Sequence, residues 1–339
     1  MSATDVAEAA RAERGALLPG APSRLRRILS SYLFRRFLKA FLTIFLMATF
    51  TFFLIRMMPG GPVDAYIANL VNQFHMSHEA AERQAASLFS LDLDAPVIQQ
   101  YGDYIKGLVT ADMGESFTSR GTPVSALILR YLPWTLFSVG GALMISFTVG
   151  VLLGMLMAYK RESTLDHILT NVGSITSSVP DYITGMLLLV WVGVQWGLLD
   201  VTAMRGTLTP GVEPSPNLVF LGDALFHAAL PMMTYILGTI GLWMLNMRSS
   251  TEATLGEDYV TVARARGLKD ARIATAYVGR NASLPLFTQL TISIAFVVGA
   301  SLLIEWLFVY QGLGYVLYDS IQKRDYPVMQ GVFLTITAM

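Results

Sequence analysis

One segment, Ala40 to Ile55, contains no charged side chain and limits the possible folds of this chain more than any other. Basic residues flank it, with Lys39 before the run and Arg56 after it. An α-helix of about 20 residues crosses the roughly 30 Å hydrocarbon core of a bilayer. A helix also satisfies its own backbone hydrogen bonds, which lipid cannot do. The sequence therefore predicts a membrane-spanning helix from about Phe37 to Met58.

Apolar runs of comparable length recur, and together they predict an all-α, polytopic membrane protein with six transmembrane helices. The mean hydropathy of +0.51 and the 14% share of charged residues agree, because a soluble protein of this size needs more charge on its surface. The further spans are predicted at about Leu132–Ala158, Leu165–Leu198, Phe226–Met247, Leu284–Phe308 and from Pro327 onward.

Two of these spans are irregular. The third is too long for one straight helix, and Ser177 to Asp181, with Pro180 inside, predicts a break or kink in its middle. Polar backbone at membrane depth needs protein or a water-filled cavity around it. The sixth run reaches Met339 after about 13 residues, which cannot cross the core as a helix. We expect that this span is truncated rather than re-entrant.

Lys and Arg predict which segments face the cytoplasm, because cytoplasmic loops carry an excess of positive charge. Residues 1–36 hold seven Arg and residues 248–283 hold six basic residues, whereas residues 59–131 hold only four, against eight acids. The sequence therefore predicts a cytoplasmic N-terminal extension at residues 1–30, which lacks the apolar stretch of a cleaved signal. Residues 59–131 are predicted to form an external helical cap, and residues 248–283 a cytoplasmic loop.

The cytoplasmic loop is the segment most informative about function. Leu255, Tyr259 and Val262 recur at helical spacing and predict the apolar face of a short helix. Gly267 is predicted to end that helix as a left-handed cap residue, and Asp270 to cap a second helix. The apolar face of the second helix is predicted to contain Ile273, Ala274, Tyr277 and Val278.

Such a helix, turn and helix on the cytoplasmic surface fits two interpretations. The first helix carries acids in its first turn and Arg264 and Arg266 in its last, which suits insertion into a groove of a soluble partner. Amphipathic helices of an ordinary loop can instead lie on the lipid headgroups. Physical reasoning from the residues leaves both interpretations open.

Several short motifs, in a fixed order, resemble those of a known family. They are Pro59-Gly60-Gly61-Pro62, Asp112-Met113-Gly114-Glu115-Ser116, Glu257-Asp258-Tyr259, Ala263-Arg264-Ala265-Arg266-Gly267, Arg280-Asn281-Ala282-Ser283-Leu284-Pro285, Gly312-Leu313-Gly314 and Lys323-Arg324-Asp325-Tyr326-Pro327-Val328. From Tyr32 to Met339 the chain resembles the permeases of dipeptide and oligopeptide ABC importers, within the binding-protein-dependent transport system inner-membrane component family. The long external segment resembles that of the B-type member of the B and C permease pair.

The resemblance implies that residues 31–339 form a permease domain, in which the cytoplasmic loop docks on an ATPase. The residues it assigns to coupling are Glu257, Asp258, Tyr259, Ala263, Arg264, Ala265, Arg266, Gly267, Arg280 and Asn281. It implies as partners a homologous C-type permease, two cytoplasmic ATP-binding subunits that bind ATP and Mg²⁺, and an extracytoplasmic substrate-binding protein. Short peptides are the implied cargo, with nickel chelates or oligosaccharides as the alternative, carried across a prokaryotic inner membrane.

The chain departs from the family's usual pattern at several positions. They are Gly61, Thr261, Tyr277, Gly279 and Gln311. At Gly61, Tyr277, Gly279 and Gln311 the family often has Asp, His, Leu and Pro, in that order, and at Thr261 the wider importer superfamily has an acidic residue. These differences leave the resemblance intact and weaken an assignment of the substrate by analogy.

The chain lacks the residues that other functional classes need. No Gly-x-x-x-x-Gly-Lys-Ser/Thr run is present to hold ATP phosphates, so we expect neither ATPase activity nor a cofactor in this chain. We expect no catalytic residue and no metal site, since there is no cysteine and the four histidines are scattered. A net charge of zero argues against nucleic acid as a partner.

Asp181 and Glu305 are the acidic residues predicted at membrane depth. Such residues usually face a bundle interior or an aqueous cavity, so each is a candidate for a pathway or interface position. Hydrogen bonding between helices is the alternative explanation for both. A secondary transporter would need coupling-ion groups and commonly shows inverted repeats, and the sequence offers little of either.

Single cysteines can test the predicted topology, because the chain has none of its own. We expect cysteines placed in residues 1–30 or 252–272 to react with a membrane-impermeant thiol reagent only from the cytoplasmic side. Cysteines in residues 75–120 should react only from outside. Reaction of either region from the opposite side would contradict the predicted topology.

Overall fold

The computed structural model describes residues 32–57, 61–88, 96–119 and 121–339. Within these ranges the chain consists of helices and turns, and its β contacts amount to one isolated bridge between Glu115 and Pro123. This confirms the predicted all-α class. The predicted N-terminal extension at residues 1–30 lies outside the described residues.

The first half of the chain contains a first span, the group of helices predicted to be external and a second span. Its helices are α3 (Tyr32–Arg56), α4 (Pro62–Phe74), α5 (His78–Leu88), α6 (Val97–Val109), α7 (Val124–Thr135), the π-helical η1 (Leu136–Gly140) and α8 (Gly141–Tyr159). The segment η1 joins α7 to α8, so that Val124–Tyr159 is one continuous helix.

The second half of the chain contains a broken span, two long helices and, between them, the loop predicted to be cytoplasmic. Its helices are α9 (Thr164–Ser178), α10 (Asp181–Leu187), the π-helical η2 (Leu188–Gln195), α11 (Leu218–Leu255), α12 (Asp258–Ala265), α13 (Asp270–Arg272), the π-helical η3 (Ile273–Gly279), α14 (Arg280–Ala282), α15 (Leu284–Leu307), α16 (Leu313–Lys323) and α17 (Tyr326–Ala338).

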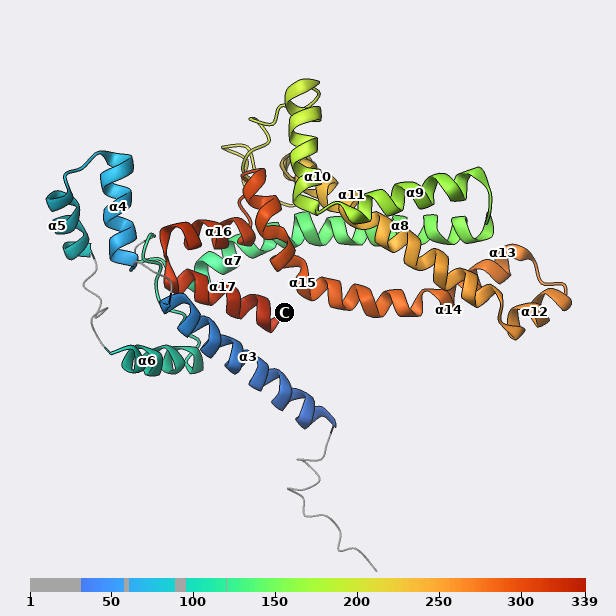
Figure 1. The fold of residues 1–339 in the computed structure, drawn as a ribbon, viewed down its shortest axis with the longest axis horizontal. Coiled ribbons are helices and arrows are strands. Elements are labelled where there is room, and N and C mark those ends of the chain that lie inside the picture. Colours follow the sequence, from blue (N-terminus) through green and yellow to red (C-terminus); the bar gives the residue numbers. More distant parts are fainter. Residues whose placement is uncertain (1–31, 58–60, 89–95, 120) are drawn as a thin grey trace, which may run out of the picture.

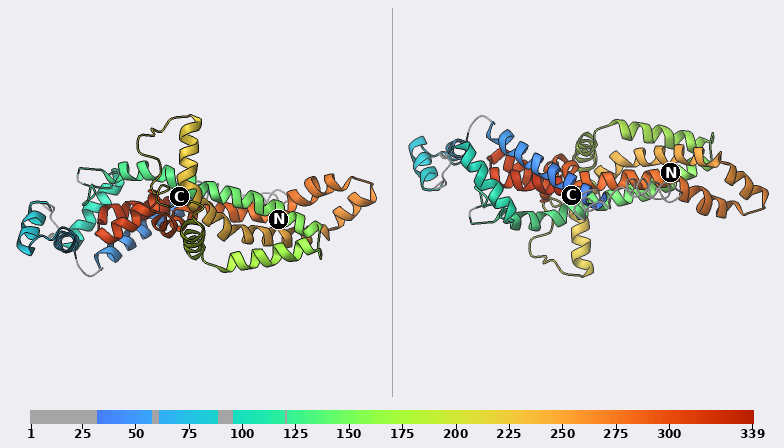
Figure 2. Two further views of the ribbon diagram at one scale, coloured as in Figure 1. Left: turned by 90° about the horizontal axis from the view of Figure 1, so that it is seen from above. Right: turned by 90° about the horizontal axis from the view of Figure 1, so that it is seen from below.

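The helices are arranged along one long axis. Helices α4 and α5 lie at one end of this axis, and α12 and α13 lie at the other (Figure 1). Between these ends α8, α9, α15 and the later part of α11 run roughly along the axis, whereas the first part of α11, yellow in Figure 2, projects across it. The segment predicted to be external and the loop predicted to be cytoplasmic are therefore at opposite ends of the bundle, as a topology with one on each side of a membrane requires.

Four helices in the described residues are long and apolar enough to cross a bilayer, namely α3, the α7–α8 helix, α11 and α15. Helix α9 together with α10 and η2 is a fifth candidate, bent by 103°. The bend confirms the predicted break in the third span. Val179 is extended there (φ −94°, ψ 125°) because the following residue, Pro180, disfavours helical geometry before it.

Two of the spans are longer than predicted. The second helix begins at Val124 instead of Leu132, and the fourth runs from Leu218 to Leu255 instead of from Phe226 to Met247. Asn217 caps the start of the fourth helix by accepting a backbone hydrogen bond of 2.7 Å. Hydropathy detects only the part of a helix that lies in lipid, whereas caps determine where the helix ends in water.

The predicted sixth span corresponds to α17, which has 13 residues. Val328, Met329 and Val332 of this helix are buried, and Met329 packs with Ile55 of α3. A helix of this length falls short of the bilayer core. A sixth helix that crosses the membrane therefore stays a prediction.

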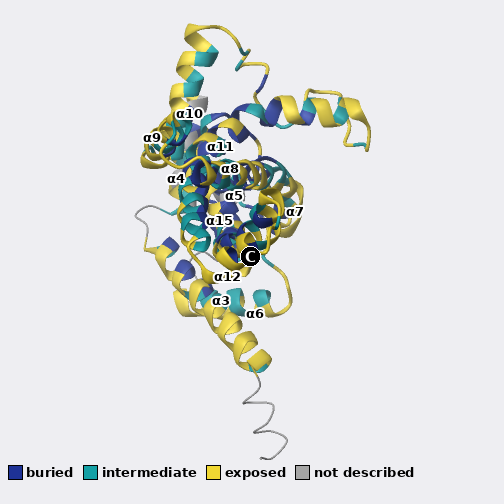
Figure 3. Cartoon of the chain, turned by 90° about the vertical axis from the view of Figure 1, so that its right-hand side faces the viewer, coloured by how far each residue is buried: buried dark blue, intermediate teal, exposed yellow. Residues whose placement is uncertain are grey.

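Much of the surface of the spans is apolar. Figure 3 shows that α3 and α10 are exposed along most of their length, and Phe37 and Phe41 of α3 are 76% and 60% exposed. Water contact with so much apolar surface would be unfavourable, whereas lipid tails or a second membrane subunit can cover it. The exposed surface is thus that of a membrane protein.

Glycines bring α8 and α11 into close contact. A Cβ on Gly150 would overlap Trp243, and a Cβ on Gly154 would overlap the carbonyl oxygen of Met244. Trp243 is 1% exposed and meets Phe147 edge to face, with 5.1 Å between the ring centroids. Small residues are typical of such contacts, because lipid tails give membrane helices no hydrophobic drive to associate.

Gly154→Ala should lower the thermal stability of the detergent-solubilised protein, because the new Cβ meets the α11 backbone. Overpacking of this kind costs about 1–3 kcal/mol. Gly140→Ala is the matched control in the same continuous helix, since nothing lies within 4 Å of a Cβ there. Thermal unfolding followed by fluorescence measures both variants. Equal midpoints would contradict the close α8–α11 contact.

Candidate functional site

The loop predicted to be cytoplasmic forms a helix, a turn and a second helix at the end of α11. The first helix, α12, follows its N-cap residue Glu257, with Asp258 in its first turn and Arg264 in its last. Acidic groups near a helix N-terminus and basic groups near its C-terminus complement the helix dipole. The charge pattern of this segment therefore stabilises a helix that is only two turns long.

The turn at Gly267 has the predicted left-handed geometry, with φ +72°. The backbone N–H of Gly267 donates to the carbonyl of Arg264 at 2.9 Å, and that of Leu268 donates to the carbonyl of Ala263 at 3.3 Å. These two hydrogen bonds form a Schellman motif. A residue with a Cβ would be strained at this φ, so glycine permits the turn.

The prediction that Asp270 caps the second helix is wrong. Lys269 is the N-cap residue, with an extended ψ of 137°, and Asp270 is the first residue of α13. A carboxylate in the first turn still complements the helix dipole, which explains why an acid at this position resembles a cap. From α13 the helical path continues through η3 and α14 to the start of α15.

The apolar face predicted for the first helix is also wrong. Tyr259 and Val262 are 38% and 55% exposed. Leu255 is the last residue of α11, and Gly256 separates it from α12. Because a helix ends between these residues, periodicity counted from Leu255 does not continue into α12. Tyr259 and Val262 therefore face outward.

The interior of the loop is a small apolar cluster between the two helices. Its buried members are Val260, Ala263, Ile273 and Val278. Tyr277 is partly buried against this cluster, and Ala274 is also partly buried, which confirms the face predicted for the second helix. The cluster fixes the two helices against each other, so the loop is a folded unit.

Asn281 joins the two parts of the loop that the sequence motifs singled out. Its side-chain amide donates to the hydroxyl of Tyr259 at 2.9 Å and to the carbonyl of Tyr277 at 2.9 Å. Ala263 is the one buried residue among those assigned to coupling. The others are exposed, namely Glu257, Asp258, Tyr259, Arg264, Ala265, Arg266, Gly267, Arg280 and Asn281.

An ion pair that the sequence did not predict links the base of this loop to the spans. Arg248 of α11 contacts Asp166 of α9 through Nε to Oδ1 at 2.8 Å and through Nη2 to Oδ2 at 2.9 Å. Asp166 is 1% exposed and also accepts the backbone N–H of Glu162 at 3.1 Å. The only sign of this ion pair in the sequence was that both residues are charged and lie beside apolar runs. Their pairing across 82 positions could not be predicted from the sequence.

Glu305 lies on the last turn of α15 and is fully buried. Thr135 donates to one carboxylate oxygen at 2.6 Å, and the backbone N–H of Tyr315 donates to the other at 3.0 Å. Tyr315 is in the first turn of α16, so the carboxylate caps this helix from a neighbouring one. Gly312 permits the approach, since a Cβ there would overlap the carboxylate. A pathway role for Glu305 stays a prediction.

Asp181 begins α10 at the break in the third span and is partly exposed. Gly185 of the same helix lies against Leu307 of α15. Asp181 and Glu305 therefore both belong to the middle of the molecule, while the coupling residues lie at one end of its long axis (Figure 1). The pathway or interface role of Asp181 also stays a prediction.

A second buried carboxylate that the sequence did not single out ties the external segment to α17. Asp325 is 1% exposed and accepts hydrogen bonds from Ser116 Oγ at 2.5 Å and Thr118 Oγ1 at 2.8 Å. The backbone N–H groups of Phe117 and Thr118 also donate to it, each at 3.1 Å. Ser116 and Asp325 each belong to one of the motifs that resemble the family. The order of these motifs along the chain did not show that they are in contact.

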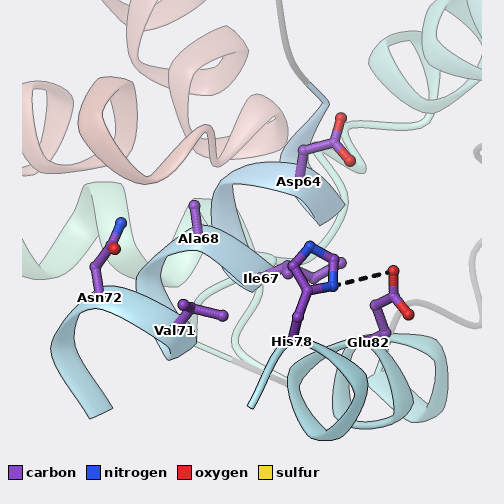
Figure 4. Close-up of a pocket in the computed structure, with 7 residues that line it drawn as sticks. All are labelled: Asp64, Ile67, Ala68, Val71, Asn72, His78 and Glu82. Atoms are coloured by element: carbon purple, nitrogen blue, oxygen red, sulfur yellow. Dashed lines mark ion pairs between the residues drawn. The ribbon is translucent and has the colours of Figure 1, made fainter. Parts of the chain in front are cut away.

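The external helices carry an open pocket of about 340 Å³ between α4 and α5 (Figure 4). It is lined by Asp64, Ile67, Ala68, Val71, Asn72, His78 and Glu82. His78 pairs with Glu82 at 3.2 Å, and both side chains are more than half exposed. Elsewhere on the cap, burial raises the pKa of the Tyr104 phenol to about 12, against the opposing effect of Arg56. The pocket is a solvated surface feature outside the bundle.

Two family models match the chain. Residues 150–339 match the model of the family described as binding-protein-dependent transport system inner membrane component. Residues 29–137 match the model of the N-terminal region of such membrane components. The chain belongs to the binding-protein-dependent transport system inner membrane component family. It is therefore a membrane-spanning permease component of such a system, which confirms the resemblance found in its motifs.

Curated relatives cover most of the chain. The di/tripeptide transport system permease protein DppB of Pseudomonas aeruginosa is 33% identical, over 91% of this chain and 92% of that protein. The dipeptide transport system permease protein DppB of Escherichia coli K12 is 34% identical, over 85% and 87%. The oligopeptide transport system permease protein AppB of Bacillus subtilis is 28% identical, over 90% and 91%. Membership of the family thus extends over nearly the whole length of the chain.

Asp166→Asn should loosen the loop that follows α11, because Arg248 then loses its buried carboxylate partner and keeps only the pair with Glu252 of its own helix, at 3.3 Å. A charged hydrogen bond contributes about 1.5–3 kcal/mol, and part of this is lost to solvent because Arg248 is 27% exposed. We expect faster trypsin cleavage after Arg264 and Arg266 in the purified membrane protein. The control is Asp319→Asn, which removes the exposed pair with Lys323. Equal cleavage rates would show that the Asp166 pair does not hold the loop.

Proposed function

We propose that the chain is the B-type permease subunit of an ATP-driven importer of short peptides. In this proposal it pairs with a homologous C-type permease and receives its substrate from an extracytoplasmic binding protein. Two cytoplasmic ATP-binding subunits drive the cycle. This chain contains no Gly-x-x-x-x-Gly-Lys-Ser/Thr segment that could hold the ATP phosphates. The proposal therefore assigns the binding of ATP and Mg²⁺ to these two subunits.

The outer face of α12 is the observation that supports this proposal most directly. Tyr259 and Val262 leave apolar surface exposed on a helix that stands clear of the spans. A short helix with exposed apolar anchors and charged ends is suited to a groove in a soluble protein. The alternative, a loop lying on lipid headgroups, accounts less well for its place at the far end of the long axis (Figure 1).

The proposed mechanism is alternating access driven from this loop. Helix α11 has 38 residues with Pro231 inside it, and its later part runs along the long axis and continues to the start of the loop (Figure 2). Closure of the ATPases would move α12, and the Arg248–Asp166 pair would carry the movement to α9 as well as to α11. Rigid helices then transmit the displacement to the pathway at membrane depth.

The cargo follows from the relatives, which are named for di/tripeptide, dipeptide and oligopeptide transport. We therefore propose short peptides. Nickel chelates and oligosaccharides remain the alternative cargo. Uptake of each class into proteoliposomes that contain the complete importer and its binding protein distinguishes them, and uptake of a chelate or sugar without peptide uptake would overturn the peptide assignment.

The proposed orientation places the N-terminus, including residues 1–30, and the loop at residues 248–283 in the cytoplasm. Residues 59–131 then lie outside a prokaryotic inner membrane. Excess Lys and Arg in the first two segments supports this orientation. Co-purification tests the assembly, because the importer proposal requires the ATPases and the second permease to accompany the chain in mild detergent. Isolation of a functional transporter without ATPases would favour a secondary transporter.

Gly267→Val should uncouple the importer. A β-branched side chain at φ +72° costs about 1–2 kcal/mol and misdirects the helix that follows. We expect normal membrane insertion, together with the loss of uptake and of ATP hydrolysis stimulated by the loaded binding protein.

The matched control for this variant is Gly256→Ala in the same loop. Gly256 has an ordinary φ of −81°, and a Cβ there makes only normal contacts. The control should retain uptake and stimulated ATPase activity. Wild-type coupling in Gly267→Val would show that the turn does not transmit the movement.

A further inference from the structure

The carboxylate of Asp181 lies at a break inside a membrane span. Helix α9 starts at Thr164, next to the short turn that contains Lys160 and Arg161, and has 15 residues. At 1.5 Å per residue it rises about 22 Å, which is less than the roughly 30 Å thickness of the hydrocarbon core. Asp181 follows directly after this rise, so it lies at membrane depth.

Helix α11 holds this carboxylate without neutralising it. A Cβ on Gly238 would overlap Asp181 Oδ1, so glycine at this position lets the carboxylate lie directly against the α11 backbone. Among the described residues, no basic side chain lies within ion-pair distance of Asp181, and no hydrogen bond reaches it. A carboxylate at this depth is costly without a positively charged partner or water.

A polar surface leads along α9 to this carboxylate. Asn171, Ser174 and Ser178 are exposed and follow one another at spacings of three and four residues, so they share one face of the helix. The Ser178 hydroxyl donates to the carbonyl of Ser174 at 2.7 Å. A polar face that ends at a carboxylate favours a water-filled pathway or a polar protein surface over lipid. Asp181 is the single charged group at the end of this uncharged polar face.

We propose that Asp181 binds the protonated amino group of the imported substrate inside the pathway. This inference rests on the proposed function and specifies ammonium as the group that the pathway recognises. An ammonium supplies the positive charge and the hydrogen-bond donors that the described residues do not place beside Asp181. Partial exposure keeps the pair weak enough to release its ligand, as transport requires. The ammonium can be the α-amino group of a peptide or the side chain of a lysine.

Charge-selective labelling tests the site without reference to any peptide. Ser178→Cys introduces the sole cysteine of this chain, and the assembled importer is treated with cationic or anionic methanethiosulfonate reagents. The cationic reagent should react about fivefold faster with Asp181 present than with Asp181→Asn, as expected for a nearby charge in a wet site. Failure of both reagents to react, or equal rates with and without the carboxylate, would overturn the proposal.

Transport by Asp181→Asn tests the ligand itself. Initial uptake rates are compared for dialanine, N-acetyl-dialanine and N-acetyl-lysyl-alanine. We expect kcat/KM for dialanine to fall about tenfold, in line with the loss of a charged hydrogen bond, and that for N-acetyl-dialanine to stay unchanged. A loss with N-acetyl-lysyl-alanine as well would show that a side-chain ammonium is also bound. Asp103→Asn, at an exposed position on α6, is the control and should alter none of the rates.

Each other outcome has a definite meaning. An equal loss for dialanine and N-acetyl-dialanine would show that Asp181 acts on structure alone and would overturn the proposal. Loss of the second permease during purification of Asp181→Asn would identify a basic group of that subunit as the partner, and would also overturn it. If the wild-type importer carries none of the three peptides, the peptide assignment fails, while the labelling rates still decide whether Asp181 attracts cations.

Discussion

The rest of the structure depends on the close contact between α8 and α11. Lipid offers neither hydrogen bonds to the backbone nor a hydrophobic drive between helices, so the spans must associate through close packing of small residues. Gly150 and Gly154 provide this contact, with Trp243 buried against them. Once α11 is fixed in this way, its C-terminal end positions Arg248 and the loop that is proposed to couple transport to ATP hydrolysis.

The sequence predicted the elements that follow from local chemistry. Uncharged runs located the spans, Pro180 located the break in the third, and Gly267 identified a left-handed turn. Predictions failed where a helix end was hidden inside a periodic pattern, as between Leu255 and α12, or where an acid in a first helical turn resembled a cap, as at Asp270. Caps and helix ends in water leave no mark in hydropathy, which is why two spans extend beyond their predicted bounds.

The functional groups that the sequence did not reveal are all parts of long-range pairs. Asp166 meets Arg248 and Asp325 meets Ser116 only after the helices are assembled. The sequence did draw attention to Asp181 and Glu305 as acids at membrane depth, but it could not distinguish their surroundings. The structure separates them, because one carboxylate receives hydrogen bonds from Thr135 and the α16 backbone, and the other receives none among the described residues.

The capping of α16 by Glu305 limits where the molecule can move. The same carboxylate contacts α7 through Thr135 and α16 through Tyr315, so separation of these helices would leave a buried charge without donors, which is strongly unfavourable. Helices α7, α15 and α16 therefore behave as one rigid body. Any hinge that opens a passage must lie elsewhere, and the broken span between α9 and α10, whose two halves already diverge by 103°, has the geometry to act as one.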